Sequence, residues 1–203
     1  MTIRKITRIL AIAAVLLTAV STAEAQTYRF GPKGGLAIGW LPGTVINGDE
    51  LIKPHNTFYA GVAGNAVFGN GFFMQAELLY AGRGHSDRGE IGGKYSRTLG
   101  YLQLPLLFGV EVLEDKIFLS AGPELGYLVT DKIKADLPSL SSEAAKFNLS
   151  IGLQATYLIS DEFGIELKFD GGLNRTFKGT YGGAEDKAHN IGLQIGICYL
   201  FEL

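Results

Sequence analysis

The C-terminal stretch from His189 to Leu203 alternates between two kinds of side chain. One set of alternate positions carries mostly isoleucine, leucine and aromatic residues, and the other carries mostly glycine, asparagine and glutamine. A period of two places these sets on opposite faces of a β-strand. Small and amide-bearing side chains suit the inside of a narrow barrel, so the large apolar face is expected to contact lipid.

The same two-faced alternation recurs about eight times along the chain, and one face is always the more apolar. The predicted strands cover residues 28–40, 57–68, 72–81, 99–112, 117–130, 147–159, 163–173 and 189–203. This pattern predicts an all-β fold: an eight-stranded antiparallel transmembrane up-and-down β-barrel. The 28 glycines fit turns and close packing inside a narrow barrel.

The connections between these strands are long and short in turn. Long loops are predicted at residues 41–56, 82–98, 131–146 and 174–188, and short turns at 69–71, 114–116 and 160–162. Bacterial barrels alternate long external loops with short periplasmic turns. The spacing therefore predicts a protein of the cell outer membrane with both termini on the periplasmic side.

Outward aromatic residues gather at the ends of the predicted strands, near the loops and near the turns. This distribution resembles the two aromatic girdles that mark membrane interfaces. The predicted interfacial residues are Trp40, Phe58, Tyr80, Tyr127, Phe147, Tyr157, Tyr199 and Phe201.

Three prolines, Pro32, Pro105 and Pro123, fall inside predicted strands. Proline has no backbone N–H, and a barrel in lipid can hardly leave its partner carbonyl unmatched. We therefore expect local β-bulges at these positions.

The N-terminal segment has the pattern of a cleaved secretory signal peptide. Arg4, Lys5 and Arg8 precede an apolar core, and Ala23-Glu24-Ala25 forms a cleavage site. Residues 1–25 are thus predicted to be removed, which leaves one barrel domain over residues 26–203. The removed segment carries three of the 18 basic and one of the 20 acidic residues, so the mature net charge is −4. That charge argues against a nucleic-acid partner.

Residues for redox or metal chemistry are sparse. Cys198 is the only cysteine, and the three histidines are scattered. No disulfide framework, metal site or cofactor is expected from this set.

Polar and charged residues on the inward faces are the first candidates for a functional site. They could line a polar pore or ligand site, or they could pair with one another and fill the lumen. An eight-stranded barrel is just wide enough for side chains to fill, which favours the second interpretation. The predicted interior polar network consists of Arg29, Lys33, Glu77, Glu111, Glu124, Glu166, Lys168 and Asp170.

The second long loop, residues 82–98, carries Arg83, Arg88, Lys94 and Arg97. These residues could meet lipopolysaccharide phosphates, or they could simply be solvated, as charged loops commonly are. The same loop contains His85-Ser86-Asp87, where a lipid-modifying hydrolase would place part of its catalytic set. Adjacent residues cannot form a triad by themselves, because the geometry comes from separate elements.

Several short motifs resemble the PorT-type outer-membrane β-barrel family. They are Lys33-Gly34-Gly35-Leu36, Gln75-Ala76-Glu77-Leu78-Leu79-Tyr80, Tyr101-Leu102-Gln103-Leu104-Pro105-Leu106-Leu107 and Ala121-Gly122-Pro123-Glu124-Leu125-Gly126. The resemblance implies the barrel fold and the outer-membrane location, and the family's namesake is associated with a protein-secretion system. Tyr199 and Phe201 also resemble the C-terminal signal by which such barrels are recognised for assembly, although Leu203 replaces the usual terminal aromatic residue.

Together these features predict a non-enzymatic barrel with a structural or interaction role carried by its external loops. The expected partners are outer-membrane lipid and lipopolysaccharide, the barrel-assembly machinery, and a secretion-system or surface protein. Two alternatives stay open. A rim hydrolase requires His85 and Ser86 to approach an acid from another loop, and a soluble lipocalin-like carrier requires the large apolar residues to point inward.

Overall fold

The computed structural model describes residues 25–40, 53–68, 71–88, 94–113, 116–135, 143–175, 177–178, 180–181, 184–185 and 189–203. The predicted signal peptide lies outside these residues except for Ala25, so it stays a prediction. The described part of the chain contains no helix that is long and apolar enough to cross a membrane.

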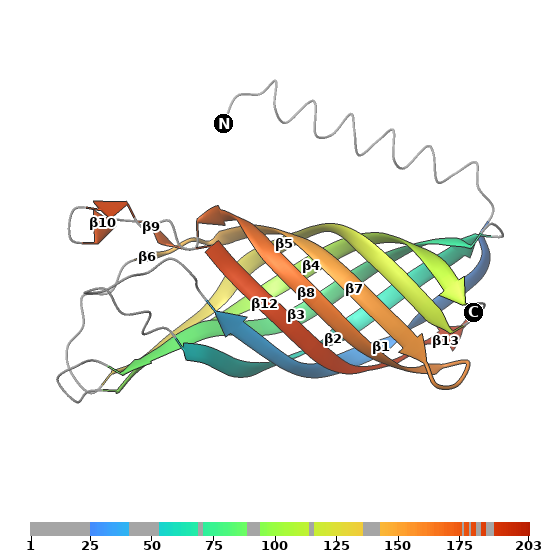
Figure 1. Ribbon diagram of the computed structural model, residues 1–203, viewed down its shortest axis with the longest axis horizontal. Helices are drawn as coiled ribbons and strands as arrows, with labels where there is room; N and C mark the ends of the chain where they lie inside the picture. The colour runs from blue at the N-terminus through green and yellow to red at the C-terminus, as the bar shows by residue number, and fades with distance from the viewer. Residues whose placement is uncertain are drawn as a thin grey trace, which may run out of the picture.

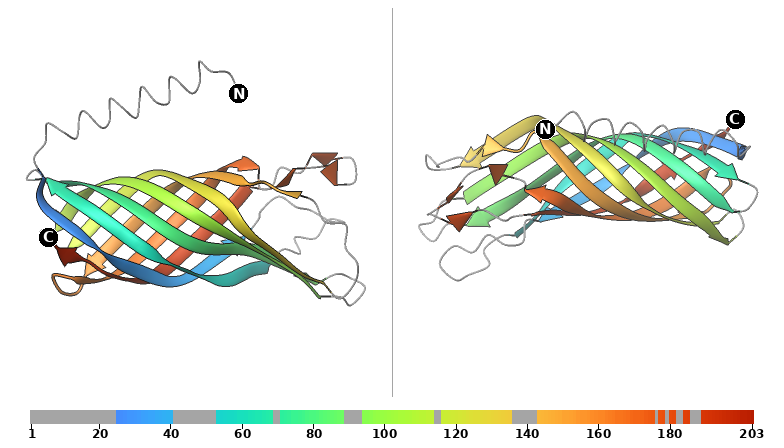
Figure 2. Two further views of the ribbon diagram at one scale, coloured as in Figure 1. Left: turned by 180° about the vertical axis from the view of Figure 1, so that it is seen from behind. Right: turned by 90° about the horizontal axis from the view of Figure 1, so that it is seen from above.

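Eight long antiparallel strands form a closed barrel, as Figures 1 and 2 show. They are β1 (Ala25–Trp40), β2 (Lys53–Phe68), β3 (Phe72–Arg88), β4 (Lys94–Leu113), β5 (Ile117–Ala135), β7 (Phe147–Leu158), β8 (Phe163–Arg175) and β12 (His189–Tyr199). Each pairs with the next, and β12 pairs with β1 to close the sheet. After Leu200 the last strand continues as β13 (Phe201–Glu202), which also pairs with β1. The predicted eight-stranded fold is confirmed.

Four short strands lie at the loop end of the barrel. There β6 (Glu143–Ala144) pairs with β9 (Phe177–Lys178), and β10 (Thr180–Tyr181) pairs with β11 (Ala184–Glu185).

The side chains of this barrel are arranged with apolar residues outside and polar residues inside. Along β7, exposed and buried residues alternate: 55% of Leu153 is exposed, against 4% of its neighbour Gln154. Leucine, isoleucine, valine and aromatic side chains dominate the exposed face of every long strand. A soluble carrier requires the opposite arrangement, so that alternative is wrong.

The short turns lie close to where the sequence places them. Gly71 has φ of 76° and donates its N–H to Phe68 O, which closes the β2–β3 turn. Lys116 N donates to Leu113 O between β4 and β5, and the β7–β8 turn lies between Leu158 and Phe163. The positive φ explains a glycine at position 71.

The predicted loop at residues 82–98 is wrong in its bounds, and so is the predicted start of the next loop at residue 131. Strand β3 continues to Arg88, β4 begins at Lys94, and β5 continues to Ala135. These extensions pair up to Arg88–Lys94 and Tyr95–Ala135. The sequence of these extensions lacks the alternating apolar face that reveals a membrane strand, because backbone hydrogen bonds can continue a ladder whatever side chains the strands carry.

The expected bulges at Pro32, Pro105 and Pro123 are also wrong. Register shifts occur elsewhere, for example between Gly100 and Tyr101. Pro105 lies in a short gap in the β3–β4 ladder, and Pro123 lies in one in the β4–β5 ladder, with the register the same on both sides. Pro32 lies where β1 passes from β13 to β12. Each proline interrupts only one of its two ladders, because a strand residue donates its N–H to one neighbour.

Candidate functional site

The candidate site is the polar interior of the barrel. Seven of the eight predicted network residues are buried in the lumen: Arg29, Lys33, Glu77, Glu124, Glu166, Lys168 and Asp170. The eighth, Glu111, is half-buried beside the β2–β3 turn, where its N–H donates to Gly71 O. The period of two places these charges inside because their strand neighbours on either side face lipid.

One half of the network is centred on Lys33 from β1. Its Nζ lies 2.6 Å from Glu77 Oε1 on β3 and 2.8 Å from Glu166 Oε2 on β8. Lys33 also donates to Gln154 Oε1 at 3.4 Å. Strand β2 separates β1 from β3 in the sheet, so the Lys33–Glu77 pair reaches past the neighbouring strand.

The other half of the network begins at Lys168, which is fully buried. Its Nζ lies 3.1 Å from Glu77 Oε2 and 3.3 Å from Glu124 Oε1. Arg83 continues the sequence of charges, with NH2 3.8 Å from Glu124 Oε2 and NH1 2.6 Å from Asp170 Oδ2. Acids and bases therefore alternate in a chain of seven side chains, which we call the ion chain: Glu166, Lys33, Glu77, Lys168, Glu124, Arg83 and Asp170.

Neutral side chains complete the coordination of the ion chain. Tyr59 OH donates to Glu166 Oε1 at 2.6 Å, and Gln75 Nε2 donates to Glu77 Oε1. With its amide oxygen turned toward Arg83, Gln103 accepts from Arg83 Nε at 3.1 Å. Buried ions need such partners, because an unsatisfied buried charge is costly.

Sequence reasoning missed Arg83 and Arg97 as interior residues, because both fell in the predicted loop 82–98. Both are buried. Arg97 binds Asp131 through two contacts, Nε–Oδ1 at 2.9 Å and NH2–Oδ2 at 2.6 Å. The spacing of both residues indicates that they face inward. Arg83 lies an even number of residues after the inward-facing Glu77, and Arg97 lies an even number before the inward-facing Gln103.

Two glycines make room for the carboxylates of the ion chain. A Cβ atom at Gly192 would lie 2.5 Å from Asp170 Oδ1, and one at Gly152 would overlap Glu124 Oε1. Both glycines face inward from strands beside those carboxylates. Any larger residue at either position must displace a buried charged group.

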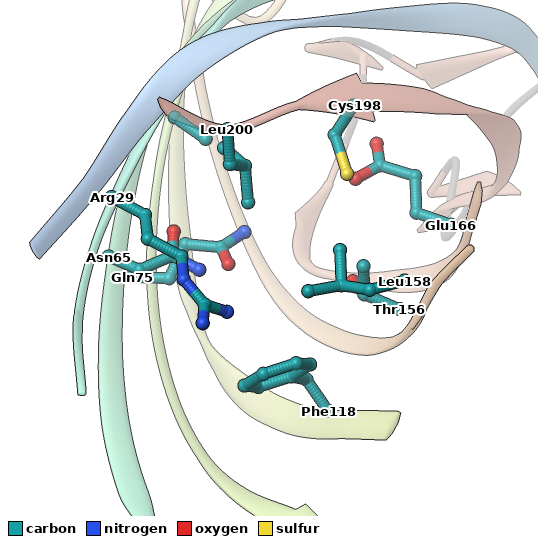
Figure 3. A pocket seen from close by; sticks show the side chains of 10 residues that line it. Arg29, Asn65, Gln75, Phe118, Thr156, Leu158, Glu166, Cys198 and Leu200 are labelled. Carbon is teal, nitrogen blue, oxygen red and sulfur yellow. The ribbon is translucent and has the colours of Figure 1, made fainter. Parts of the chain in front are cut away.

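A small pocket lies at the turn end of the lumen, and Figure 3 shows the side chains that line it. Its empty volume is about 310 Å³, part of it open to solvent. The Arg29 guanidinium lies over the Phe118 ring, 5.8 Å from the centroid, with Glu166 and Cys198 on the other side of the pocket. Arg29 also approaches Glu202, at 4.0 Å.

Apolar clusters lie at both ends of the ion chain. Phe73, Phe118 and Leu158 pack together at the turn end, and Leu99, Tyr101 and Ala144 pack at the loop end. A lumen packed in this way resembles a filled barrel more than a water-filled channel.

The predicted interfacial aromatics occupy both ends of the outer surface. Phe58, Tyr127, Phe147, Tyr157, Tyr199 and Phe201 are exposed, whereas Trp40 and Tyr80 are half-buried. Rings contact in pairs at the loop end, Phe58 with Tyr80 and Tyr127 with Phe147, and at the turn end, Tyr199 with Phe201. On the loop side of Phe58 in β2, His55 Nε2 lies 3.0 Å from Thr98 Oγ1. Partial burial lowers the pKa of this imidazole.

Comparison with known proteins identifies the family. A family model described as "Outer membrane protein beta-barrel domain" matches residues 24–178, which is most of the chain. The chain belongs to this outer-membrane β-barrel family. It is therefore a protein of the outer membrane, as predicted. A comparison with curated proteins found no significant match.

Solved structures agree on the barrel fold. The outer membrane protein OprG from Pseudomonas aeruginosa is similar with a TM-score of 0.50 at 11% identity, over 88% of this chain and 98% of that one. Neisserial surface protein A is similar with a TM-score of 0.51 at 8% identity, over 85% of this chain and 97% of that one. At these identities the likeness shows the fold alone.

The residues proposed for a hydrolase fall in a strand and not in a loop. His85, Ser86 and Asp87 belong to β3, where His85 pairs with Pro54 and with Arg97. Their side chains lie outside the described part of the structure. Among the described residues no cluster of His, Cys, Asp or Glu is arranged to hold a metal ion.

Proposed function

We propose that this outer-membrane barrel is a non-catalytic scaffold that presents an external β-ribbon to a protein partner. The observation that carries the proposal is the unequal length of the strands. Strands β3, β4 and β5 have 17, 20 and 19 residues, against 12 in β7 and 13 in β8. We call the extension the rim ribbon; it consists of residues 83–88, 94–99 and 131–135. It projects from the loop end of the barrel in Figures 1 and 2.

The rim ribbon suits recognition because it is a paired β-structure, which we place outside the membrane. Backbone pairing continues along it, and the Arg97–Asp131 pair ties β4 to β5. Binding residues are commonly held on such a scaffold above a stable framework. A packed lumen fits the same role, since a transport pore needs a free path that the ion chain and its apolar ends occupy.

We also propose that this chain is a PorT-type member of the outer-membrane barrels, because its motifs resemble those of that family. The resemblance favours a partner that belongs to a secretion system or the cell surface. Lipopolysaccharide contact by four basic loop residues is less favoured than the sequence indicates, because Arg83 and Arg97 face inward and pair with carboxylates. Contact with lipid along the outer face and with the barrel-assembly machinery during insertion completes the proposed set of partners.

A photo-crosslinking residue in place of Lys132 tests the proposal in intact cells. Lys132 is exposed on the rim ribbon, and Leu153 on the lipid-facing side of β7 provides the control position. We expect a discrete protein adduct from position 132 and only lipid adducts from position 153. Stepwise ion conductance of the purified barrel in planar bilayers, or the absence of any adduct from the ribbon, would contradict the scaffold role.

A further inference from the structure

The ion chain has one more acid than it has bases. Its four carboxylates belong to Glu77, Glu124, Glu166 and Asp170, and its three cations belong to Lys33, Arg83 and Lys168. Among the described residues, two other cations are buried, Arg29 and Arg97, and each has a carboxylate outside the ion chain, Glu202 and Asp131. If every group were ionised, the ion chain would bury a net negative charge.

The four carboxylates are not held equally well. Glu77 has two lysines at 2.6 and 3.1 Å, Glu166 has Lys33 and the Tyr59 hydroxyl, and Asp170 has Arg83 at 2.6 Å. Glu124 has only the two longest ion pairs of the chain, 3.3 Å to Lys168 and 3.8 Å to Arg83. Its side chain is 1% exposed, and its oxygens, like those of Asp170, accept no hydrogen bond from a described residue. Glu124 differs from Asp170 in that it has no cation as close as the 2.6 Å between Arg83 NH1 and Asp170 Oδ2.

The surroundings of Glu124 contain other acids besides its two cations. Among the described residues, the charged groups that act on it are Lys168, Asp170, Arg83 and Glu77. Its partners on the adjacent strands are Pro105 on β4 and Ser150 on β7, and neither carries a charge. Burial without a close cation favours the neutral form of a carboxyl group over its ionised form.

We propose that the barrel lumen binds one proton, and that Glu124 is the residue that holds it. A proton needs no cavity, whereas the described residues offer no acidic cluster arranged for a metal ion. With Glu124 neutral, three carboxylates face three cations and the ion chain carries no net charge. The protonated carboxyl group also gains an O–H donor, in a lumen where the oxygens of both Glu124 and Asp170 accept no hydrogen bond from a described residue.

Infrared spectroscopy of the full chain folded in lipid vesicles tests the proton directly. At neutral pH the wild-type protein should show the C=O stretching band of a protonated carboxyl group, Glu124→Gln should lose it, and Glu111→Gln should keep it. Glu111→Gln is the control, because Glu111 is a half-buried glutamate of β4 outside the ion chain, and its replacement leaves the balance of charges in the ion chain unchanged. Absence of the band from the wild type, or its survival in Glu124→Gln, would overturn the proposal.

Stability provides a second readout. A glutamine imitates a neutral glutamic acid, so Glu124→Gln should leave the unfolding equilibrium constant within about threefold of wild type. Lys33→Met removes the closest cation from both Glu77 and Glu166 and should raise that constant by about a hundredfold or more. A Glu124→Gln chain that unfolds as readily as Lys33→Met, or fails to fold when Lys33→Met folds, would contradict a neutral Glu124.

The pH dependence of unfolding distinguishes a proton bound at Glu124 from a purely structural role of this residue. Above the pH at which an exposed glutamate ionises, the folded wild type holds one more proton than the unfolded chain. The unfolding equilibrium constant should therefore rise by up to about tenfold per pH unit from this group. Glu124→Gln should remove that dependence, and an unchanged slope in the variant would place the proton elsewhere.

Discussion

Lys33 Nζ lies 2.6 Å from Glu77 Oε1, and both side chains are fully buried in the lumen of an outer-membrane barrel. The two residues come from strands that are not neighbours in the sheet. Their contact therefore depends on the closed barrel, which brings inward side chains together across its interior. It also links the two halves of the ion chain, since Glu77 contacts Lys168 as well.

Loss of Lys33 should be strongly destabilising. In Lys33→Met, Glu77 and Glu166 both lose their closest cation. Breaking a buried ion pair from one side typically costs about 3–5 kcal/mol. We expect a decrease of this size in the free energy of unfolding, measured by urea titration of the barrel in lipid vesicles. The double variant Lys33→Met with Glu77→Gln should lose less than the sum of the two single variants, and strict additivity would show that the two residues do not interact.

Even a methyl group at position 192 should lower the stability of the barrel. In Gly192→Ala the added Cβ lies 2.5 Å from Asp170 Oδ1, so the carboxylate that Arg83 contacts must move. Overpacking of this kind costs about 1–3 kcal/mol. Gly171→Ala is the matched control, because a Cβ atom there meets nothing within 4 Å. Equal stabilities for the two alanine variants would show that the lumen has free space beside Asp170.

Arginine substitutions on the outer surface should destabilise the barrel more near the middle of the membrane than near its edges. Leu153 is an exposed lipid-facing residue in the middle of β7, and Val129 is an exposed residue beyond the aromatic Tyr127. An arginine near the bilayer midplane of a barrel costs about 2–4 kcal/mol, and one near an interface about 0–1 kcal/mol. Leu153→Arg should therefore lower the free energy of unfolding far more than Val129→Arg. The reverse order would mean that lipid covers a different part of the barrel.

The sequence predicts much of the fold because a membrane barrel repeats one pattern. In β7 and β12 the alternation alone identifies which side chains face lipid and which face the lumen. It also places Lys33, Glu77, Glu166 and Lys168 inside, although it does not pair them. Pairing depends on register and on the tilt of the strands around the barrel, which bring Lys33 to Glu77 across 44 positions of sequence.

The failures have physical reasons too. The sequence predicts a loop at Arg83 and Arg97 because the rim ribbon has no apolar face, although their even spacing from Glu77 and Gln103 indicates an inward direction. The bulges expected at Pro105 and Pro123 do not occur, because each strand residue donates to only one neighbour and a single ladder can skip a pair.

Site-specific thiol labelling of intact cells tests the central claim most directly. In a Cys198→Ser background, single cysteines replace Lys132 on the rim ribbon, Lys116 in the β4–β5 turn and Leu153 on the lipid-facing surface. A membrane-impermeant reagent should label position 132 in intact cells and position 116 only after the outer membrane is disrupted, with position 153 protected in both. Labelling of position 116 but not 132 in intact cells, or ready labelling of position 153, would contradict a barrel that crosses the outer membrane with its ribbon outside.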